Sequence, residues 1–117
     1  MYVKAIDWID IDNYEASVVI SDGLFDIVCF LDDCSYKVGD IIDDDIKVLG
    51  VHDIFISEVN TETIISQSGF RYEIIGRYEN NKLFLGEIII SIDSELVPKD
   101  ISSGDYIHVC IDRFDLW

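Results

Sequence analysis

The chain has 117 residues, half of them apolar, and carries 24 acidic side chains against 8 basic ones, for a formal net charge of −16. This apolar content is too high for a disordered acidic tail, and the length suits one domain with its own core. The strong negative charge repels phosphate, so we expect no binding of nucleic acid or of an anionic membrane surface. It favours a basic protein partner instead.

The residue types favour β-structure throughout. Isoleucine and valine number 31, whereas alanine and leucine, which lead the helix scale, number nine. Short apolar runs separated by turn residues predict strands at Tyr2–Ile9, Tyr14–Ser21, Leu24–Leu31, Ile46–Leu49, Ile54–Val59, Thr63–Ser66, Tyr72–Tyr78, Lys82–Ile92 and Tyr106–Phe114. We therefore predict a single all-β domain over residues 1–117. Its architecture is a small antiparallel barrel, OB-like or related, or a compact sandwich, with at most a short helical turn near 94–101.

Four dipeptides mark turns in this pattern. Asp22-Gly23 and Asn80-Asn81 are typical of tight hairpins, because glycine and asparagine tolerate positive φ. Gly39-Asp40 and Gly104-Asp105 both stand just before apolar residues, in a way that resembles the start of a strand in small barrels, including OB-like ones. In each, glycine supplies the sharp turn and the aspartate carboxylate bonds nearby amides.

The acidic side chains concentrate near the N-terminus. Residues 7–45 hold twelve carboxylates and one base, which gives −11 of the total charge of −16. We expect these carboxylates to gather on one face, with exposed aromatic side chains among them as interface anchors. The candidate partner-binding residues are Asp7, Trp8, Asp10, Asp12, Tyr14, Asp32, Asp33, Asp43, Asp44 and Asp45.

Cation binding and catalysis find weaker support in the sequence. Cys29, Cys34 and Cys110, with His52 and His108, are the soft metal ligands, but their spacing matches no zinc motif, so ordinary packing is the favoured interpretation. The acidic run Asp43–Asp45 offers oxygen ligands to calcium but lacks the EF-hand spacing, which favours a solvated loop. His108, Cys110 and Asp112 share one strand face, yet neighbours two apart stand parallel rather than converging. We expect no enzymatic activity and no metal or other cofactor.

Other features bear on compartment and on charge pairing. The odd number of cysteines indicates reduced thiols and favours a cytoplasmic protein. Residues 1–7 have no secretory-signal layout, and the longest apolar run, Ile27–Leu31, is too short for a membrane span. We expect the three arginines to pair with carboxylates, and Trp117 to close one end of the barrel.

The leading functional hypothesis is an acidic protein-binding module that docks a basic protein partner. In size, acidity, single-domain form and lack of catalytic motifs, the chain resembles the small cytoplasmic immunity proteins that neutralise bacterial toxins. That resemblance implies an inhibitor that covers the phosphate-binding surface of a cationic toxin. The alternative hypothesis is an accessory structural β-barrel subunit of a larger assembly, without catalytic activity, in which the carboxylates serve solubility.

Overall fold

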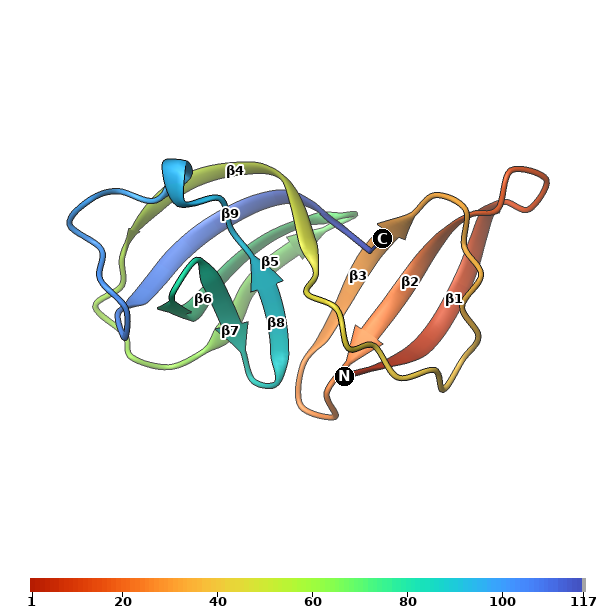
Figure 1. Ribbon diagram of the computed structural model, residues 1–117, viewed down its shortest axis with the longest axis horizontal. Coiled ribbons are helices and arrows are strands. Elements are labelled where there is room, and N and C mark those ends of the chain that lie inside the picture. The colour runs from red at the N-terminus through yellow and green to blue at the C-terminus, as the bar shows by residue number, and fades with distance from the viewer. Residues whose placement is uncertain (117) are drawn as a thin grey trace.

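A single nine-stranded sheet dominates the computed structural model, which describes residues 1–116 (Figure 1). The strands are β1 (Tyr2–Asp10), β2 (Glu15–Ser21), β3 (Asp26–Leu31), β4 (Lys47–Ile56), β5 (Thr63–Ser68), β6 (Arg71–Glu79), β7 (Lys82–Leu85), β8 (Ile88–Ser91) and β9 (Tyr106–Asp115). One 3₁₀ turn, η1 (Ser94–Leu96), lies in the segment where the sequence predicts a helical turn. The all-β prediction is therefore confirmed.

The sheet has two parts, which Figure 1 shows side by side along the long axis. The N-terminal lobe comprises β1, β2, β3 and the connection 32–46, and the half-barrel comprises β4 to β9. The half-barrel curls because the start of β4 meets β8: Ile46 N donates to Ile89 O, and Ser91 N donates to Ile46 O, both at 2.8 Å. The molecule is elongated, with principal extents of 45 × 25 × 23 Å.

Both predicted hairpin turns are confirmed. Asp22 N donates to Phe25 O between β2 and β3, with Gly23 at φ 93°. Asn80 and Asn81, between β6 and β7, both have positive φ, at 49° and 65°. Two consecutive residues with positive φ form a type I′ turn, whose twist matches that of the flanking strands.

Two predicted strand boundaries are wrong. The predicted strands Ile46–Leu49 and Ile54–Val59 are one strand, β4, which runs on past Gly50 and pairs with the long β9 from Lys47 to Ile56. The predicted strand Lys82–Ile92 is instead the hairpin of β7 and β8, because Gly86 at φ 61° turns the chain. In the first case, long-range pairing carries the strand through a residue that locally favours a turn.

The sheet also contains parallel pairing, which the antiparallel prediction does not include. β3 pairs with β9 in parallel at two positions, Cys29 with Phe114 and Phe30 with Asp115. The Ile46–Ile90 bridge is parallel as well. The β3–β9 pair matters for the fold because it joins the N-terminal lobe to the half-barrel in one sheet.

The two Gly-Asp turns adopt the same structure. Gly39 and Gly104 have φ of 95° and 98°. The Asp40 carboxylate accepts from Lys37 N, and the Asp105 carboxylate accepts from Ser102 N, both at 2.8 Å. Each Gly-Asp unit then bonds one strand residue twice, Val3 of β1 in the first turn and Tyr78 of β6 in the second, with all four bonds at 2.8 Å. The predicted roles of glycine and aspartate are confirmed.

The core runs through both parts of the molecule. Alternate residues of β2, β3, β6 and β9 are buried, and Tyr72 packs on Phe114 with ring centroids 5.1 Å apart. Cys29 and Cys34 belong to this core, as the packing interpretation predicts for Cys29. In residues 1–116 no helix is long and apolar enough to cross a membrane. Trp117, predicted to close the barrel, lies outside the described residues.

Candidate functional site

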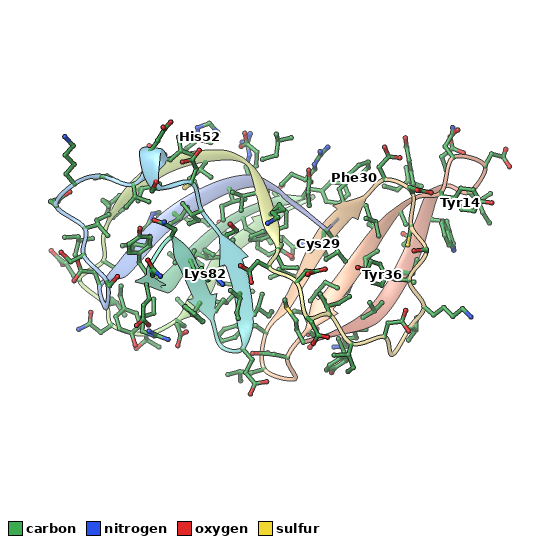
Figure 2. All side chains as sticks on the ribbon, in the orientation of Figure 1. Tyr14, Cys29, Phe30, Tyr36, His52 and Lys82 are labelled. Carbon is green, nitrogen blue, oxygen red and sulfur yellow. The ribbon has the colours of Figure 1, made fainter. Side chains whose placement is uncertain are left out.

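The turn between β1 and β2 gathers half of the predicted partner-binding residues. Cys34 N donates to Tyr14 O at 2.7 Å, so the chain leaving β3 lies beside this turn. The predicted residues that meet here are Asp10, Asp12, Tyr14, Asp32 and Asp33. Tyr14 has φ 57°, and its side chain is 55% exposed at the far end of the N-terminal lobe, where Figure 2 labels it.

Asp7 and Trp8 lie on β1 close to this end, and their side chains are on opposite faces of the sheet. Trp8 is opposite Ala16, on the face that carries the core, and remains 40% exposed. Asp7 is opposite Ser17, on the outer face, and is exposed. We call residues 7–14 together with 32–33 the acidic tip; its sequence holds five carboxylates and no lysine or arginine.

Asp43, Asp44 and Asp45 lie elsewhere. Ile42 N donates to Met1 O at 3.0 Å, which places the following residues beside the start of β1 rather than its end. β1 is nine residues long, so its two ends lie about 26 Å apart at the usual rise per residue. The expectation of one acidic face is therefore wrong: the chain connection 32–46 runs the length of β1 and divides the carboxylates between two places.

Local bonding distinguishes the carboxylates further. Asp45 pairs with Lys82 at 3.1 Å, and it is the one predicted partner-binding residue with an ion pair in residues 1–116. The Asp10 carboxylate accepts from Asp12 N at 3.1 Å and from Asn13 Nδ2 at 2.7 Å, so it also shapes the turn. The tip thus keeps most of its negative charge uncompensated, in contact with solvent.

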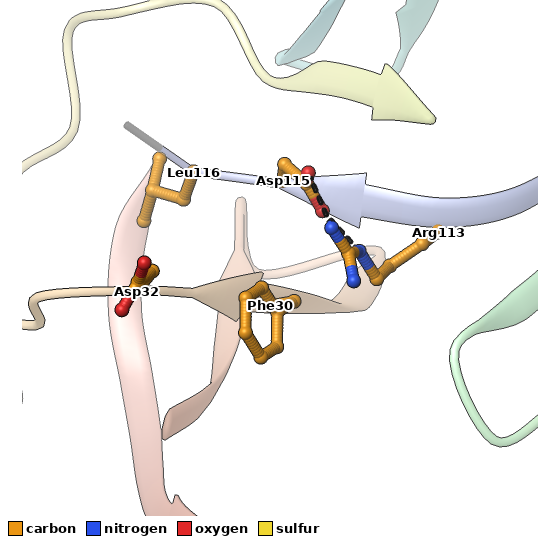
Figure 3. A pocket seen from close by; sticks show the side chains of 5 residues that line it. All are labelled: Phe30, Asp32, Arg113, Asp115 and Leu116. Atoms are coloured by element: carbon orange, nitrogen blue, oxygen red, sulfur yellow. Dashed lines mark hydrogen bonds and ion pairs between the residues drawn. The ribbon is translucent and has the colours of Figure 1, made fainter. Parts of the chain in front are cut away.

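A hollow of about 350 Å³ lies beside the tip, where the N-terminal lobe meets β9 (Figure 3). Its walls include Phe30, Asp32 and Arg113. Arg113 donates from Nε and Nη2 to both carboxylate oxygens of Asp115, at 2.6 and 2.9 Å, and its guanidinium carbon lies 4.4 Å from the centre of the Phe30 ring. The bond to Asp115 raises the pKa of Arg113. Because this cation is neutralised inside the hollow, Asp32 adds to the negative field of the tip.

The other two arginines also pair with carboxylates, as the sequence predicts. Arg71 Nη2 lies 3.4 Å from Asp112 Oδ1, and Arg77 pairs with Glu79. These pairs leave few cations of the half-barrel to offset the charge of the tip.

A second polar cluster lies on the outer face of the half-barrel, across β4, β9 and β6. His108, Cys110 and Asp112 share this face, as predicted. The sequence did not reveal their cross-strand partners: His52 Nε2 lies 2.9 Å from Asp112 Oδ2, and His108 Nε2 lies 2.6 Å from Glu73 Oε1. Residues 60 and 35 positions apart meet here only through strand register, for which the sequence has no local signal.

The chemistry of this cluster is limited. Partial burial, followed by the nearby Glu73 and Asp53 carboxylates, raises the pKa of the Cys110 thiol, which therefore stays protonated. A protonated thiol is a poor nucleophile and a poor metal ligand. The bond from His52 lowers the pKa of Asp112. Across residues 1–116, no three His, Cys, Asp and Glu side chains are arranged to hold a metal ion.

Comparisons of this chain with protein-family models, with curated proteins and with solved structures give no match.

Proposed function

We propose that this protein is a binding module whose acidic tip docks a basic protein partner. The observation that carries the proposal is the combination of uncompensated carboxylates and exposed apolar side chains at one end of the molecule. Trp8, Ile9, Ile11 and Tyr14 are each at least 40% exposed among the tip carboxylates. Apolar anchors rimmed by charge are the usual anatomy of a protein interface, and opposed fields speed the encounter of the two proteins.

More specifically, we propose that the basic partner is a bacterial toxin and that this protein is its immunity or inhibitor protein. A cationic toxin that acts on nucleic acid carries a basic phosphate-binding surface, and the acidic tip is complementary to such a surface in charge. Purified toxin would then lose nuclease activity on addition of one equivalent of this protein.

The test compares the two groups of carboxylates directly. Asp12→Asn, Asp32→Asn and Asp33→Asn are combined in a tip variant, and Asp43→Asn with Asp44→Asn forms the control. Each protein is immobilised and used at low salt to capture partners from its source cells. We expect a stoichiometric basic protein on the wild type and the control, and about tenfold weaker binding of that protein by the tip variant. Absence of such a protein, or equal binding by all three, would refute the proposal.

A second candidate, an accessory structural subunit, rests on a different observation. Phe55 and Ile56 of β4 and Ile65 of β5 are exposed on the half-barrel, away from the tip. An assembly contact through such apolar side chains changes little with salt, whereas docking at the tip weakens steeply. Measuring affinity for the captured partner at 50 and 500 mM sodium chloride separates the two candidates.

A further inference from the structure

The strand β1 lies at the end of the sheet, and no strand pairs with its outer edge, although the connection 32–46 passes beside it (Figure 1). At its start the edge is occupied, because Val3 exchanges two backbone hydrogen bonds with Gly39 and Asp40. Beyond Val3, no residue of 1–116 bonds the outer edge of β1 through its backbone. An unpaired strand edge is a template for strand addition.

The register of the neighbouring strands shows which backbone groups of β1 face outward. Val28 N donates to the Tyr72 hydroxyl, so Val28 does not bond its partner on β2, Val19. Backbone groups alternate in direction along a strand, so those of Val19 face β1 and bond its partner there, Ala5.

The same alternation applies along β1. The backbone N–H and C=O groups of Asp7 face β2, as those of Ala5 do. The backbone N–H and C=O groups of Ile6 and Trp8 point away from the sheet. β-bulges between Val3 and Ala5 and between Trp8 and Asp10 bound this stretch. The open edge therefore offers two donors and two acceptors to an added strand of about five residues.

The side chains along the open edge define the chemistry of that strand. Asp7 points to the outer face, whereas Ile6 and Trp8 point to the face that carries the core. The one base on β1, Lys4, is engaged by Asp26 at 2.6 Å. A residue added opposite Asp7 therefore meets an unpaired carboxylate, and the residues on either side of it meet Ile6 and Trp8. Opposite charges and apolar pairs facing each other across strands are both favourable.

We infer that the basic partner contributes an extended segment, alternating apolar and basic residues, that pairs as a strand with β1 at Ile6 and Trp8. The inference rests on the proposed function and specifies its binding mode. Charge disfavours a second copy as the occupant, because both copies carry a net charge of −16. β5 pairs only with β6 and has an edge of its own, but its side chains are uncharged and do not select a basic strand.

The first test uses a labelled synthetic peptide, Lys-Val-Lys-Val-Lys, with capped ends. Its valines stand opposite Ile6 and Trp8, so N-methylation of both valine amides removes the donors that face β1. The amides of the second and third lysines point away from β1. N-methylation of these two amides leaves the valine donors intact and provides the matched control. We expect about tenfold or greater loss of affinity for the valine-methylated peptide and little change for the control.

Variants of the protein test the same edge from the other side. Because Trp8 N–H faces outward, Trp8→Pro removes a donor to the added strand without removing a bond within the sheet. Trp8→Ala removes the ring alone, so weaker binding by Trp8→Pro than by Trp8→Ala measures the backbone contribution. Gln67→Pro places proline at the corresponding outward position of β5 and is expected to leave binding unchanged. Thermal melting of each variant verifies that it folds.

Amide hydrogen exchange locates the contact. We expect the amides of Ile6 and Trp8 to exchange rapidly in the free protein and to slow on peptide binding, and those of Ala5 and Asp7 to be protected in both states. Rapid exchange of Ile6 and Trp8 in both states would contradict strand pairing.

The outcomes separate failure of this binding mode from failure of the proposed function. Equal affinity for all three peptides, still lost in the tip variant, would overturn strand pairing but keep charge-driven docking at the tip. Peptide affinity unchanged both by the tip variant and by methylation of the valine amides would count against both. No binding of the unmethylated peptide at low salt would overturn the inference. A dimer in sedimentation without peptide, abolished by Trp8→Pro, would assign the edge to a second copy and overturn it as well.

Discussion

The hydroxyl of Tyr72 provides a partly buried hydrogen bond between the two parts of the molecule. Tyr72, on β6 of the half-barrel, is 2% exposed, and its hydroxyl accepts from Val28 N of β3 at 2.9 Å. Tyr72→Phe keeps the ring that packs on Phe114 but leaves the Val28 N–H without a partner. An unsatisfied buried donor costs about 1–3 kcal/mol. Unfolding entropy of about 2.1 cal/mol/K per residue over 117 residues converts this cost to a fall in Tm of about 4–12 °C.

Urea unfolding measures this loss directly. We expect a lower midpoint with an unchanged m-value, because the variant keeps the same fold and the same buried surface. Tyr78→Phe is the matched control: its hydroxyl donates to Asn81 Oδ1 at 3.1 Å, and because Asn81 is exposed and can bond water instead, removal of the hydroxyl costs about 0.5–1 kcal/mol. If Tyr72→Phe loses no more stability than Tyr78→Phe, the bond to Val28 does not hold the two parts together.

Three further predictions concern the turns and the charge. Gly86→Ala would place a Cβ in steric clash with the Asp22 carboxylate at φ 61°, so we expect about 2 kcal/mol or more of destabilisation by urea unfolding. Gly69→Ala has the same φ but meets open space, so it should lose only the backbone strain, about 1 kcal/mol. Burial opposes ionisation of Asp22, but bonds from the amides of Phe25, Glu87 and Leu24 lower its pKa. The ionised Asp22 carboxylate therefore stabilises the fold above its unfolded pKa of 3.8, and this stabilisation is lost as pH falls through the folded pKa. The stability difference between wild type and Asp22→Asn should accordingly shrink in acid, and a constant difference would contradict this. Because the net charge is −16, Tm should rise from low to moderate sodium chloride, and an unchanged Tm would mean local compensation of the carboxylates.

Local chemistry made much of the fold predictable from the sequence. Asn80-Asn81 and the two Gly-Asp turns place residues that accept positive φ where the chain reverses, so each turn is encoded by its own residues. The β-branched composition likewise favours strands wherever apolar runs occur. These signals fix the type of each element and the position of most turns.

What the sequence could not reveal depends on pairing between distant strands. Gly50 locally favours a break, yet β9 pairs with β4 on both sides of it and makes one strand of two predicted ones. The parallel contact of β3 with β9 has no local signature for the same reason.

The candidate site was predictable in composition but not in arrangement. Tyr14 and Asp33 were predicted to lie in one site, and they meet because the chain leaves β3 beside the β1–β2 turn. Asp43 was assigned to that site as well, but the following connection carries it to the other end of β1. Sequence proximity within an acidic segment therefore did not establish spatial proximity.

The attachment of the N-terminal lobe also bears on how the acidic tip would bind. Besides the Tyr72 bond, the Asp22 carboxylate accepts from Glu87 N at 2.7 Å, and Leu116 N donates to Phe30 O at 3.1 Å. These three bonds lie along β3, between the half-barrel and the tip, and they hold the lobe at several points rather than at one hinge. A docking surface fixed in this way loses little conformational entropy when a partner binds, so more of the contact energy remains as affinity. Weakening the attachment through Tyr72→Phe should accordingly slow association with a basic partner less than it speeds dissociation.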